Sequence, residues 1–368
     1  MKKLTILLSA SGSSSMPGLI DCFRNNGERD IRIVGMDMHN EPSAKYLVDV
    51  FYHVPVATAS EYVDVVLDIC KKEKVDIYFP NISAEVIAVS KRKMEFERIN
   101  TILSVSDQNR VVIANNKLKL YEFLKEKGIN TPKFYGVHSL KEFEEGCRYL
   151  GYPEKPVCLK IVDGSGSRGV RIIDANRNRY QIFINEKPNS FFATYEDMLS
   201  ILQEADDFHE MLLVEYLSGN EYTVDLLADH GKVQYVVGRE NIVSLMSIAQ
   251  ESEVREDQDA YDMSESVVSS LELDGNIGFD FMRDSNGKAV LMDLNPRITA
   301  TVSVIAAAGV NLPYLRVKQL LKEELPDITP AYGTRLKRRY GEIYTDNNGN
   351  RVEIGNTRRK NKEMQIVI

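Results

Sequence analysis

Two aspartates in the second half of the chain have a spacing that could bind a metal ion. The dipeptide Asn286-Gly287 lies between two alternating apolar runs and predicts a β-hairpin. A two-residue loop there would place Asp280 directly opposite Asp293. Like charges that face each other on a sheet are destabilising, and a buried unpaired carboxylate is worse. The pair therefore calls for a cation.

Two further residues strengthen this prediction. Asn295 lies two residues after Asp293 and so on the same face of the strand. Two carboxylates and an amide oxygen suit Mg²⁺, which proteins hold through few ligands and substrate phosphates. Arg297 follows and could neutralise part of the charge or hold an anion bidentately. The alternative is a register shifted by one or two residues, which would leave one aspartate in solvent.

A glycine-rich loop, GSGSRG at residues 164–169, lies earlier in the chain. It fits GxGxxG by letter, but a dinucleotide-binding loop needs a helix after it, and the β-branched run 170–173 predicts a strand. We therefore reject the dinucleotide interpretation. A glycine hairpin can instead close over phosphates, and Lys160 on the preceding strand lies where an ammonium could meet them. A mobile surface hairpin with a solvated lysine is the alternative for this loop taken alone.

Composition and missing motifs exclude several classes of protein. The chain has 368 residues, 43% hydrophobic and 27% charged, which suits a globular protein of two or three units. The net charge of −8 argues against a nucleic-acid or anionic-membrane surface. HRD, DFG and Walker A strings are absent, and the four cysteines form no zinc or disulfide pattern. The apolar stretch 4–8 is too short for a signal peptide, so we expect a first strand there and a cytoplasmic protein.

The order of the expected elements divides the chain. Strand-like runs at 4–8, 31–36, 76–79 and 101–105 alternate with helix-like stretches near 17–24, 61–73 and 84–96, which predicts a parallel sheet. The Gly/Ser loop 11–15 lies at the end of the first strand, where such folds bind ligands. A flexible turn is the alternative there. After a helix at 116–127, short strands and hairpins follow, and the tail after Pro330 is basic, with a hairpin near residue 348.

These residues together resemble the ATP-grasp superfamily, and in particular stand-alone proteins similar to the carbamoyl-phosphate synthase large subunit. The likeness spans roughly residues 1–320. It rests on the order of Asn115-Asn116-Lys117, Lys160, the glycine loop, Glu215-Tyr216-Leu217, Glu221, Asp280 and Asp293-x-Asn295-Pro296-Arg297. Each motif is weak, whereas the order and spacing are specific.

The resemblance implies an α/β fold whose second half is α+β, namely a parallel pre-ATP-grasp domain followed by a two-subdomain ATP-grasp fold. The implied units are a Rossmann-like domain at 1–115, a lid subdomain at 116–211, a subdomain with the metal site at 212–330 and a basic tail at 331–368. A homodimer is common in the family.

The resemblance also implies a role for each matching residue. Those expected to contact ATP are Lys117, Lys160, Gly164, Ser165, Gly166, Ser167 and Gly169 at the phosphates, Glu215, Tyr216 and Leu217 as the adenine hinge, and Glu221 at the ribose. Asp280, Asp293 and Asn295 are expected to bind Mg²⁺, with Mn²⁺ as the alternative metal. Arg297 is expected to be catalytic together with Lys160, and Arg239, more loosely matched, to do similar work. Many members carry Lys-Pro where this chain has Lys160-Ile161, so the lysine is kept. Many carry Glu where this chain has Asp280 and Asp293, and the shorter aspartates would shift the metal geometry.

The expected function is an ATP-dependent ligase that joins a small-molecule carboxylate to an amine or other nucleophile through an acyl phosphate. The expected nucleotide product is ADP. The chain has length for one of the two synthase halves, which argues against complete carbamoyl-phosphate synthesis. The alternatives are a small-molecule kinase of the same fold and a nucleotide- or metabolite-binding protein without turnover.

Overall fold

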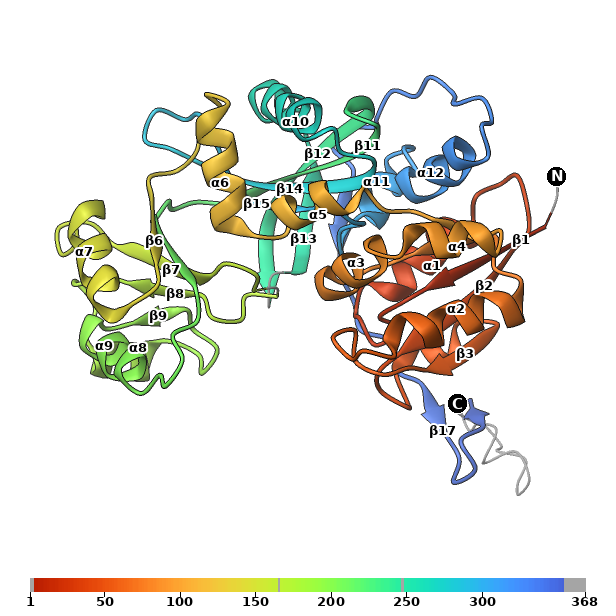
Figure 1. Cartoon of the computed structure of the whole chain (residues 1–368), viewed down its shortest axis with the longest axis horizontal. Coiled ribbons are helices and arrows are strands. Elements are labelled where there is room, and N and C mark those ends of the chain that lie inside the picture. The colour runs from red at the N-terminus through yellow and green to blue at the C-terminus, as the bar shows by residue number, and fades with distance from the viewer. Residues whose placement is uncertain (1–2, 165, 246–247, 354–368) are drawn as a thin grey trace, which may run out of the picture.

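The computed structural model describes residues 3–164, 166–245 and 248–353 (Figure 1). The first part of the chain forms a parallel sheet in the order β3-β2-β1-β4-β5. Its strands are β1 (Leu4–Leu8), β2 (Ile31–Asp37), β3 (Val50–His53), β4 (Ile77–Phe79) and β5 (Ile102–Leu103). The parallel sheet and four of its strands were predicted, whereas β3 was missed. Strand β3 has only four residues, Val-Phe-Tyr-His, and none of them is fully buried, so this short edge strand shows no alternation by which to recognise it.

Helices cover both faces of this sheet. They are α1 (Met16–Arg24), the short helix η1 (Ser43–Tyr46), α2 (Tyr62–Glu73), α3 (Ser83–Ser90), α4 (Lys93–Arg98) and α5 (Gln108–Ala114). Crossovers from β1 and β4 leave a switch point between these neighbouring strands, where open α/β sheets bind ligands. The β1–α1 and β4–α3 turns therefore lie side by side at the carboxyl edge. Among the residues described, no helix combines the length and apolar character needed to cross a bilayer.

A second sheet follows, in the order β6-β10-β7-β8-β9, and forms the left lobe of Figure 1. Its elements are α6 (Lys117–Glu126), β6 (Phe134–Val137), α7 (Leu140–Leu150), β7 (Val157–Ile161), β8 (Arg171–Ile173), α8 (Arg179–Asn185), β9 (Phe192–Ala193), α9 (Tyr195–Gln203) and β10 (Met211–Glu215). Strands β7 and β8 pair antiparallel, so the glycine loop joins two strands as expected and precedes no helix.

The third sheet has six strands in the order β15-β14-β11-β12-β13-β16. Its elements are β11 (Glu221–Asp229), β12 (Lys232–Leu245), β13 (Ile248–Val254), α10 (Gln258–Leu271), β14 (Gly275–Arg283), β15 (Ala289–Asn295), α11 (Ser303–Ala307), α12 (Leu312–Leu320) and β16 (Arg335–Lys337). Strand β16 pairs with β13, so the start of the basic tail belongs to the third sheet. The hairpin expected near residue 348 is confirmed as β17 (Tyr344–Thr345) and β18 (Arg351–Val352). Residues 354–368 of the tail lie outside the described residues.

Two hydrophobic cores join the third sheet to the other two sheets. One core joins a face of the first sheet, through residues such as Ile6 and Ile33, to α1, α11, α12 and the third sheet. A second core joins α6 and one face of β7 and β10 to the third sheet, through residues such as Leu212 and Phe279. The other face of β7 and β10 packs on α7 and α9 in a core of the left lobe alone. The first and third sheets are therefore one packed body.

The hairpin between β14 and β15 reaches the predicted pairing by a different route. Asp280 pairs with Asp293, as expected. The turn is longer than predicted: the backbone N–H of Asp284 donates to the Lys288 carbonyl, and Gly287 has a φ of +77°. A three-residue turn of this kind shifts the strands by one residue, and a bulge between Asp280 and Phe281 shifts them back.

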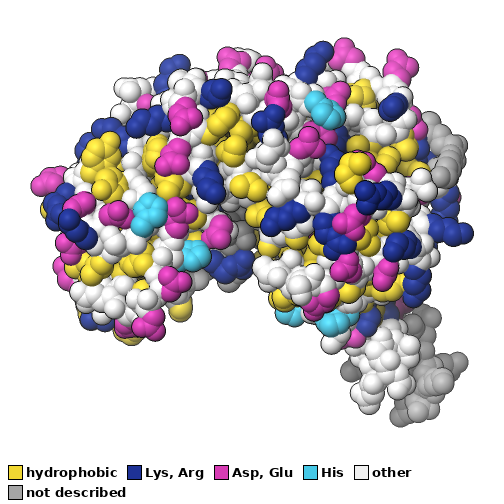
Figure 2. Space-filling model, in the orientation of Figure 1, with side chains coloured by type: hydrophobic (Ala, Val, Ile, Leu, Met, Phe, Trp, Pro, Cys, Tyr) yellow, Lys and Arg dark blue, Asp and Glu magenta, His cyan; other side chains and the backbone are white. Residues whose placement is uncertain are grey.

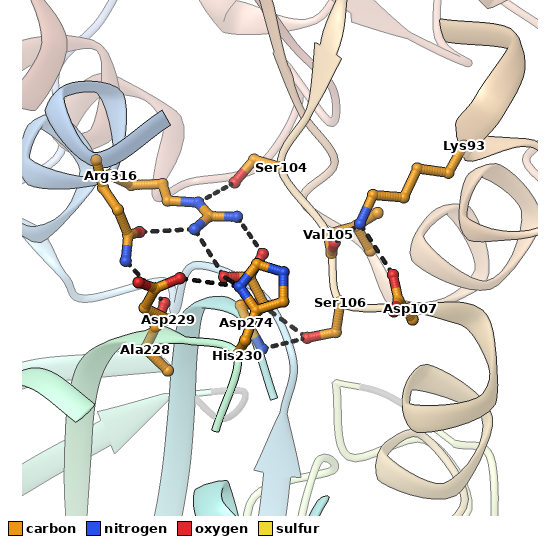
Figure 3. A network of polar contacts seen from close by, with 11 residues as sticks. Lys93, Ser104, Val105, Ser106, Asp107, Ala228, Asp229, His230, Asp274 and Arg316 are labelled. Carbon is orange, nitrogen blue, oxygen red and sulfur yellow. Dashed lines mark hydrogen bonds and ion pairs between the residues drawn. The ribbon is translucent and has the colours of Figure 1, made fainter. Parts of the chain in front are cut away.

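A buried polar network also connects the first sheet to the third (Figure 3). Arg316 on α12 binds both carboxylate oxygens of Asp274, at 2.9 and 2.6 Å, and its Nε donates to Ser104 after β5 at 3.1 Å. Ser106 bonds the backbone N–H and carbonyl of Asp274 at 2.9 and 2.8 Å. Asp229 and His230 lie beside Asp274, but Arg316 already neutralises that carboxylate, so we do not assign this cluster as a metal site.

Removal of Arg316 should destabilise the protein strongly. The Arg316 and Asp274 side chains are only 3% and 9% exposed, so Arg316→Met leaves an uncompensated buried carboxylate. We expect the free energy of unfolding to fall by about 3–5 kcal/mol in urea denaturation. The matched control, Arg24→Met, removes the exposed ion pair with Asp49 and should cost less than about 1 kcal/mol. Equal losses in the two variants would contradict this account of the network.

Candidate functional site

One cavity of about 480 Å³ lies between the three sheets, and Figure 2 shows the molecule hollowed between its two lobes. It brings together most of the predicted site residues. Those that line it are Lys117, Lys160, Gly164, Gly166, Ser167, Glu221, Arg239, Asp280, Asp293, Asn295 and Arg297. Gly169, Glu215, Tyr216 and Leu217 are not among its lining residues, and Ser165 lies outside the described residues.

The register of the third sheet aligns the predicted metal ligands. Asp293 on β15 pairs with Asp280 on β14, and Asp280 pairs with Thr223 on β11. Thr223 donates a hydrogen bond to one oxygen of Asp280 at 2.7 Å, and the Asn295 amide donates to the other at 3.2 Å. Two carboxylates and the amide oxygen of Asn295 thus share one face that opens on the cavity. This all-oxygen donor set fits Mg²⁺.

Burial and neighbouring carboxylates determine the electrostatics of this face. Burial, followed by the charges of Glu221 and Asp293, raises the pKa of Asp280 to about 8. The fold therefore disfavours the ionised form that a cation needs, and a bound cation would reverse that preference. Burial also lowers the pKa of Arg297, against the opposing effects of Asp293 and Asp280. The Asp280 carboxyl group is thus electrostatically coupled to Glu221, Asp293 and Arg297 in the cavity.

The arginine has spare donor capacity. Arg297 donates from one terminal nitrogen to the Asn295 side-chain oxygen and from the other to the Ile298 carbonyl, both at 3.0 Å. Its Nε is buried and has no hydrogen-bond partner among the described residues. A buried unpaired donor costs stability, so it needs a functional reason. An anion in the cavity would supply the missing acceptor.

Lys117 links the glycine loop to the oxygen-rich face of Asp280, Asp293 and Asn295, which we call the metal face. Its backbone N–H donates to the Val162 carbonyl at 2.9 Å, which fixes the start of α6 against the end of β7. Its ammonium lies 3.3 Å from Asp293 and donates to the Gly164 carbonyl at 3.0 Å. Lys160 lies on the same face of β7 as Cys158, as strand alternation predicted. This face packs toward the third sheet, and Lys160 lines the cavity.

The glycine loop needs glycine at its close approach to β7. Gly169 has a φ of +70°, and a Cβ there would lie 2.2 Å from the Ile161 side chain. A larger residue would therefore push the loop away from the strand. The loop thus stays close to Ile161 at the end of β7, and its residues Gly164, Gly166 and Ser167 line the same cavity as Lys160.

A polar network connects the predicted site residues Glu221 and Arg239 through three residues that were not predicted, namely Thr223, Asp225 and Asn241. Asn241 donates to Glu221 at 2.7 Å and to Thr223 at 3.0 Å, and accepts a hydrogen bond from Arg239. Arg239 also pairs with the buried Asp225 at 3.1 Å, so its charge is already balanced. The signal was present in the sequence, because Glu221, Thr223 and Asp225 alternate along one strand and so share a face.

The residues expected to hold adenine lie at the end of β10. The backbone N–H of Glu215 donates to the Lys133 carbonyl, and its carboxylate accepts from the Lys133 backbone N–H at 2.8 Å. Tyr216 packs edge-on to Phe192, with ring centroids 6.5 Å apart. These contacts fix the segment to the left lobe. The adenine role of residues 215–217 stays a prediction.

Comparisons with known proteins match both halves of the chain. Residues 6–120 match the family model "PylC-like, N-terminal domain", and residues 207–339 match "ATP-grasp in the biosynthetic pathway with Ter operon". The carbamoyl phosphate synthase large chain of Clostridium perfringens (strain 13 / Type A) is 27% identical over 281 residues, which cover 73% of this chain and 24% of that protein. The chain therefore spans about a quarter of the length of this relative.

Solved structures show the same fold. N5-carboxyaminoimidazole synthetase from Staphylococcus aureus, complexed with ADP, superposes with a TM-score of 0.66 and 15% identity, over 89% of this chain and 80% of that one. L-amino acid ligase from Bacillus licheniformis superposes with a TM-score of 0.61 and 17% identity, over 88% of this chain and 74% of that one. The expected fold class is thereby confirmed.

The raised pKa of Asp280 predicts how stability depends on pH. Because the folded-state pKa exceeds the unfolded value, the stabilisation is complete below about pH 4 and is lost as pH rises towards about 8. Without metal, wild type should lose stability relative to Asp280→Asn across this window, at no more than about 1.4 kcal/mol per pH unit. Urea unfolding at intervals of one pH unit measures the slope, and Mg²⁺ should flatten it.

Asp284 provides the control in the same hairpin. Hydrogen bonds from the Lys288 backbone N–H and from Asn286 lower its pKa, so Asp284→Asn should show no comparable trend between pH 5 and pH 8. A parallel pH profile for wild type and Asp280→Asn would contradict the raised pKa of Asp280.

Proposed function

We propose that this ATP-grasp protein is an ATP- and Mg²⁺-dependent ligase that joins a carboxylate to an amine or other nucleophile through an acyl phosphate. The observation that carries the proposal is the shared cavity. Asp280, Asp293 and Asn295 face into it together with Lys117, Lys160, the glycine loop and Arg297. One cavity thus holds an oxygen-rich face that would bind Mg²⁺, two lysines that would bind phosphates, and an arginine whose Nε has no partner among the described residues.

The residues divide between two ends of the bound ATP. Lys160, Lys117 and the loop 164–169 would hold the phosphates, whereas Glu221 and residues 215–217 would hold the ribose and adenine. Asp280, Asp293 and Asn295 would hold Mg²⁺, which supplies charge neutralisation at the phosphates when bound. Lys117, which now contacts both Asp293 and the Gly164 carbonyl, would turn its ammonium to the phosphates. The likeness to a structure complexed with ADP supports this arrangement.

The reaction then proceeds in two displacements. A carboxylate oxygen attacks the γ-phosphorus, the bond to the β–γ bridging oxygen breaks, and ADP leaves. The amine nitrogen next attacks the acyl carbon, phosphate leaves, and the nitrogen gives up a proton. Arg297 would hold the carboxylate or the transferred phosphoryl group through its unused donor. The chain's contribution is positioning and charge neutralisation, so no nucleophilic side chain is required.

Two other functions are compatible with the fold. A small-molecule kinase would stop after the phosphoryl transfer, and a binding protein would not turn over ATP. We favour the ligase because both carboxylates of the metal face are present and Arg297 has spare donor capacity beside them. A binding protein has no need of either feature. The homodimer, the cytoplasmic location and the alternative metal Mn²⁺ stay predictions.

The products of the reaction test this proposal. Incubated with Mg·ATP, pooled small carboxylates and hydroxylamine, the protein should release ADP and phosphate and form a hydroxamate. Hydroxylamine traps acyl phosphates, so the hydroxamate reports the intermediate independently of the natural amine. AMP and pyrophosphate as products would place the protein in an adenylating class. A phosphorylated product that resists hydroxylamine would identify the kinase instead.

Arg297→Lys separates transition-state stabilisation from ATP binding. Lysine keeps the charge but loses the planar fork, so ADP formation should fall roughly tenfold to a thousandfold. The affinity for Mg·ATP, measured by thermal melting, should change much less. The control is Arg255→Lys, because Arg255 pairs with Glu240 and Glu253 on the surface, does not line the cavity, and should leave turnover and ATP affinity unchanged. Equal losses in turnover and ATP affinity for Arg297→Lys would assign this arginine to nucleotide binding.

A further inference from the structure

The first part of the chain forms one wall of the cavity, and this wall is uncharged. It comes from the β1–α1 and β4–α3 turns and includes Ser13, Ser15, Met16, Asn81, Ile82 and Ser83. Among the described residues before 116 that line the cavity, none is charged. The wall lies at the switch point between β1 and β4 and lines the same cavity as Asp280, Asp293 and Asn295. It therefore offers hydroxyl, amide and apolar groups but no carboxylate to hold an ammonium.

This wall is built on a strained turn. Ala10, which lines the cavity directly after β1, has a φ of +57°, a conformation that residues with a Cβ rarely adopt. The Ser13 N–H donates to its carbonyl at 2.9 Å, so the turn sets the direction of the loop 11–15. Strain of this kind persists only where the surroundings fix it, and it is concentrated at functional sites.

A buried carboxylate holds the start of this turn, and the Asp37 carboxylate separately accepts from the Gly12 backbone N–H at 2.6 Å. Glu85, in the first turn of α3, is fully buried and accepts hydrogen bonds from the hydroxyls of Ser9, Tyr62 and Tyr78. It also accepts from the Asn81 backbone N–H at 3.0 Å. Ser9 directly precedes the strained Ala10 and accepts from the same N–H at 2.9 Å. One carboxylate thus connects both turns of the wall.

We propose that Glu85 is a positioning residue that holds these two turns as the binding wall for the acceptor nucleophile, which it receives as an uncharged group. The inference rests on the proposed function, because an acyl phosphate formed in the cavity needs an acceptor within reach of its acyl carbon, and this wall lines the same cavity. An amine must be neutral to attack, and a wall without carboxylates does not stabilise its protonated form. Glu85 does not touch the acceptor and acts through Ser9 and Asn81.

Hydrogen exchange and acceptor kinetics test the proposal on the full chain. In Glu85→Gln, the amide group cannot accept from all four donors, so exchange in segments 9–15 and 80–84 should rise about tenfold. With hydroxylamine as a neutral acceptor, its KM should rise roughly three- to tenfold, whereas kcat and the KM for Mg·ATP should stay within about twofold. Ala10→Gly removes the strain and should restore much of this KM in the double variant.

Glu73→Gln is the matched control. Glu73, at the end of α2, accepts from the Tyr52 hydroxyl and from Arg32, away from the cavity wall. The Glu73→Gln variant should change neither the hydrogen exchange of segments 9–15 and 80–84 nor the KM for hydroxylamine. If Glu85→Gln fails to fold, Ser9→Ala, which removes one donor and the bond to Asn81, provides the same comparison. Equal changes in the Glu85 and Glu73 variants, or a matching rise in the KM for ATP, would overturn the proposal. A wild type that forms no hydroxamate would refute the ligase, and exchange alone would then decide the role of Glu85.

Discussion

The repulsion between Asp280 and Asp293 is the constraint on which the rest of the site depends. The sheet register places the two carboxylates opposite each other, and burial adds to the cost of ionising Asp280. The surrounding residues offset this cost only in part: Thr223 and Asn295 donate to Asp280, and Lys117 approaches Asp293. The face remains short of positive charge, which is the condition that a divalent cation relieves.

The sequence predicted the parts of this site that depend on alternation along a strand. The pairing of Asp280 with Asp293, the direction of Lys160 and the rejection of a dinucleotide loop all follow from strand periodicity. The pairing was nevertheless reached through a turn of the wrong length. Strand periodicity gives no information on loop residues, and the structure shows that one extra residue in the turn is compensated by a bulge.

Residues that act across strands distant in sequence were not predictable in the same way. Asn241 joins Glu221 to Thr223, and Glu85 joins two turns of the first sheet. Each appears in the sequence as an ordinary polar residue, because its meaning comes from partners that only the fold brings near. The Arg316–Asp274 pair belongs to the same class, since its residues are 42 positions apart and bury their charges together.

The bulge between Asp280 and Phe281 lies between the Asp280–Asp293 pair and the turn of the hairpin. The turn at 284–288 is exposed, and exposed loop tips are where insertions and deletions are tolerated. A change of one residue there can be absorbed where the ladder is already irregular, before it reaches the Asp280–Asp293 pair. Length variation in this turn is therefore compatible with an unchanged metal face. Related chains that differ in this turn can keep the same pair of carboxylates in register.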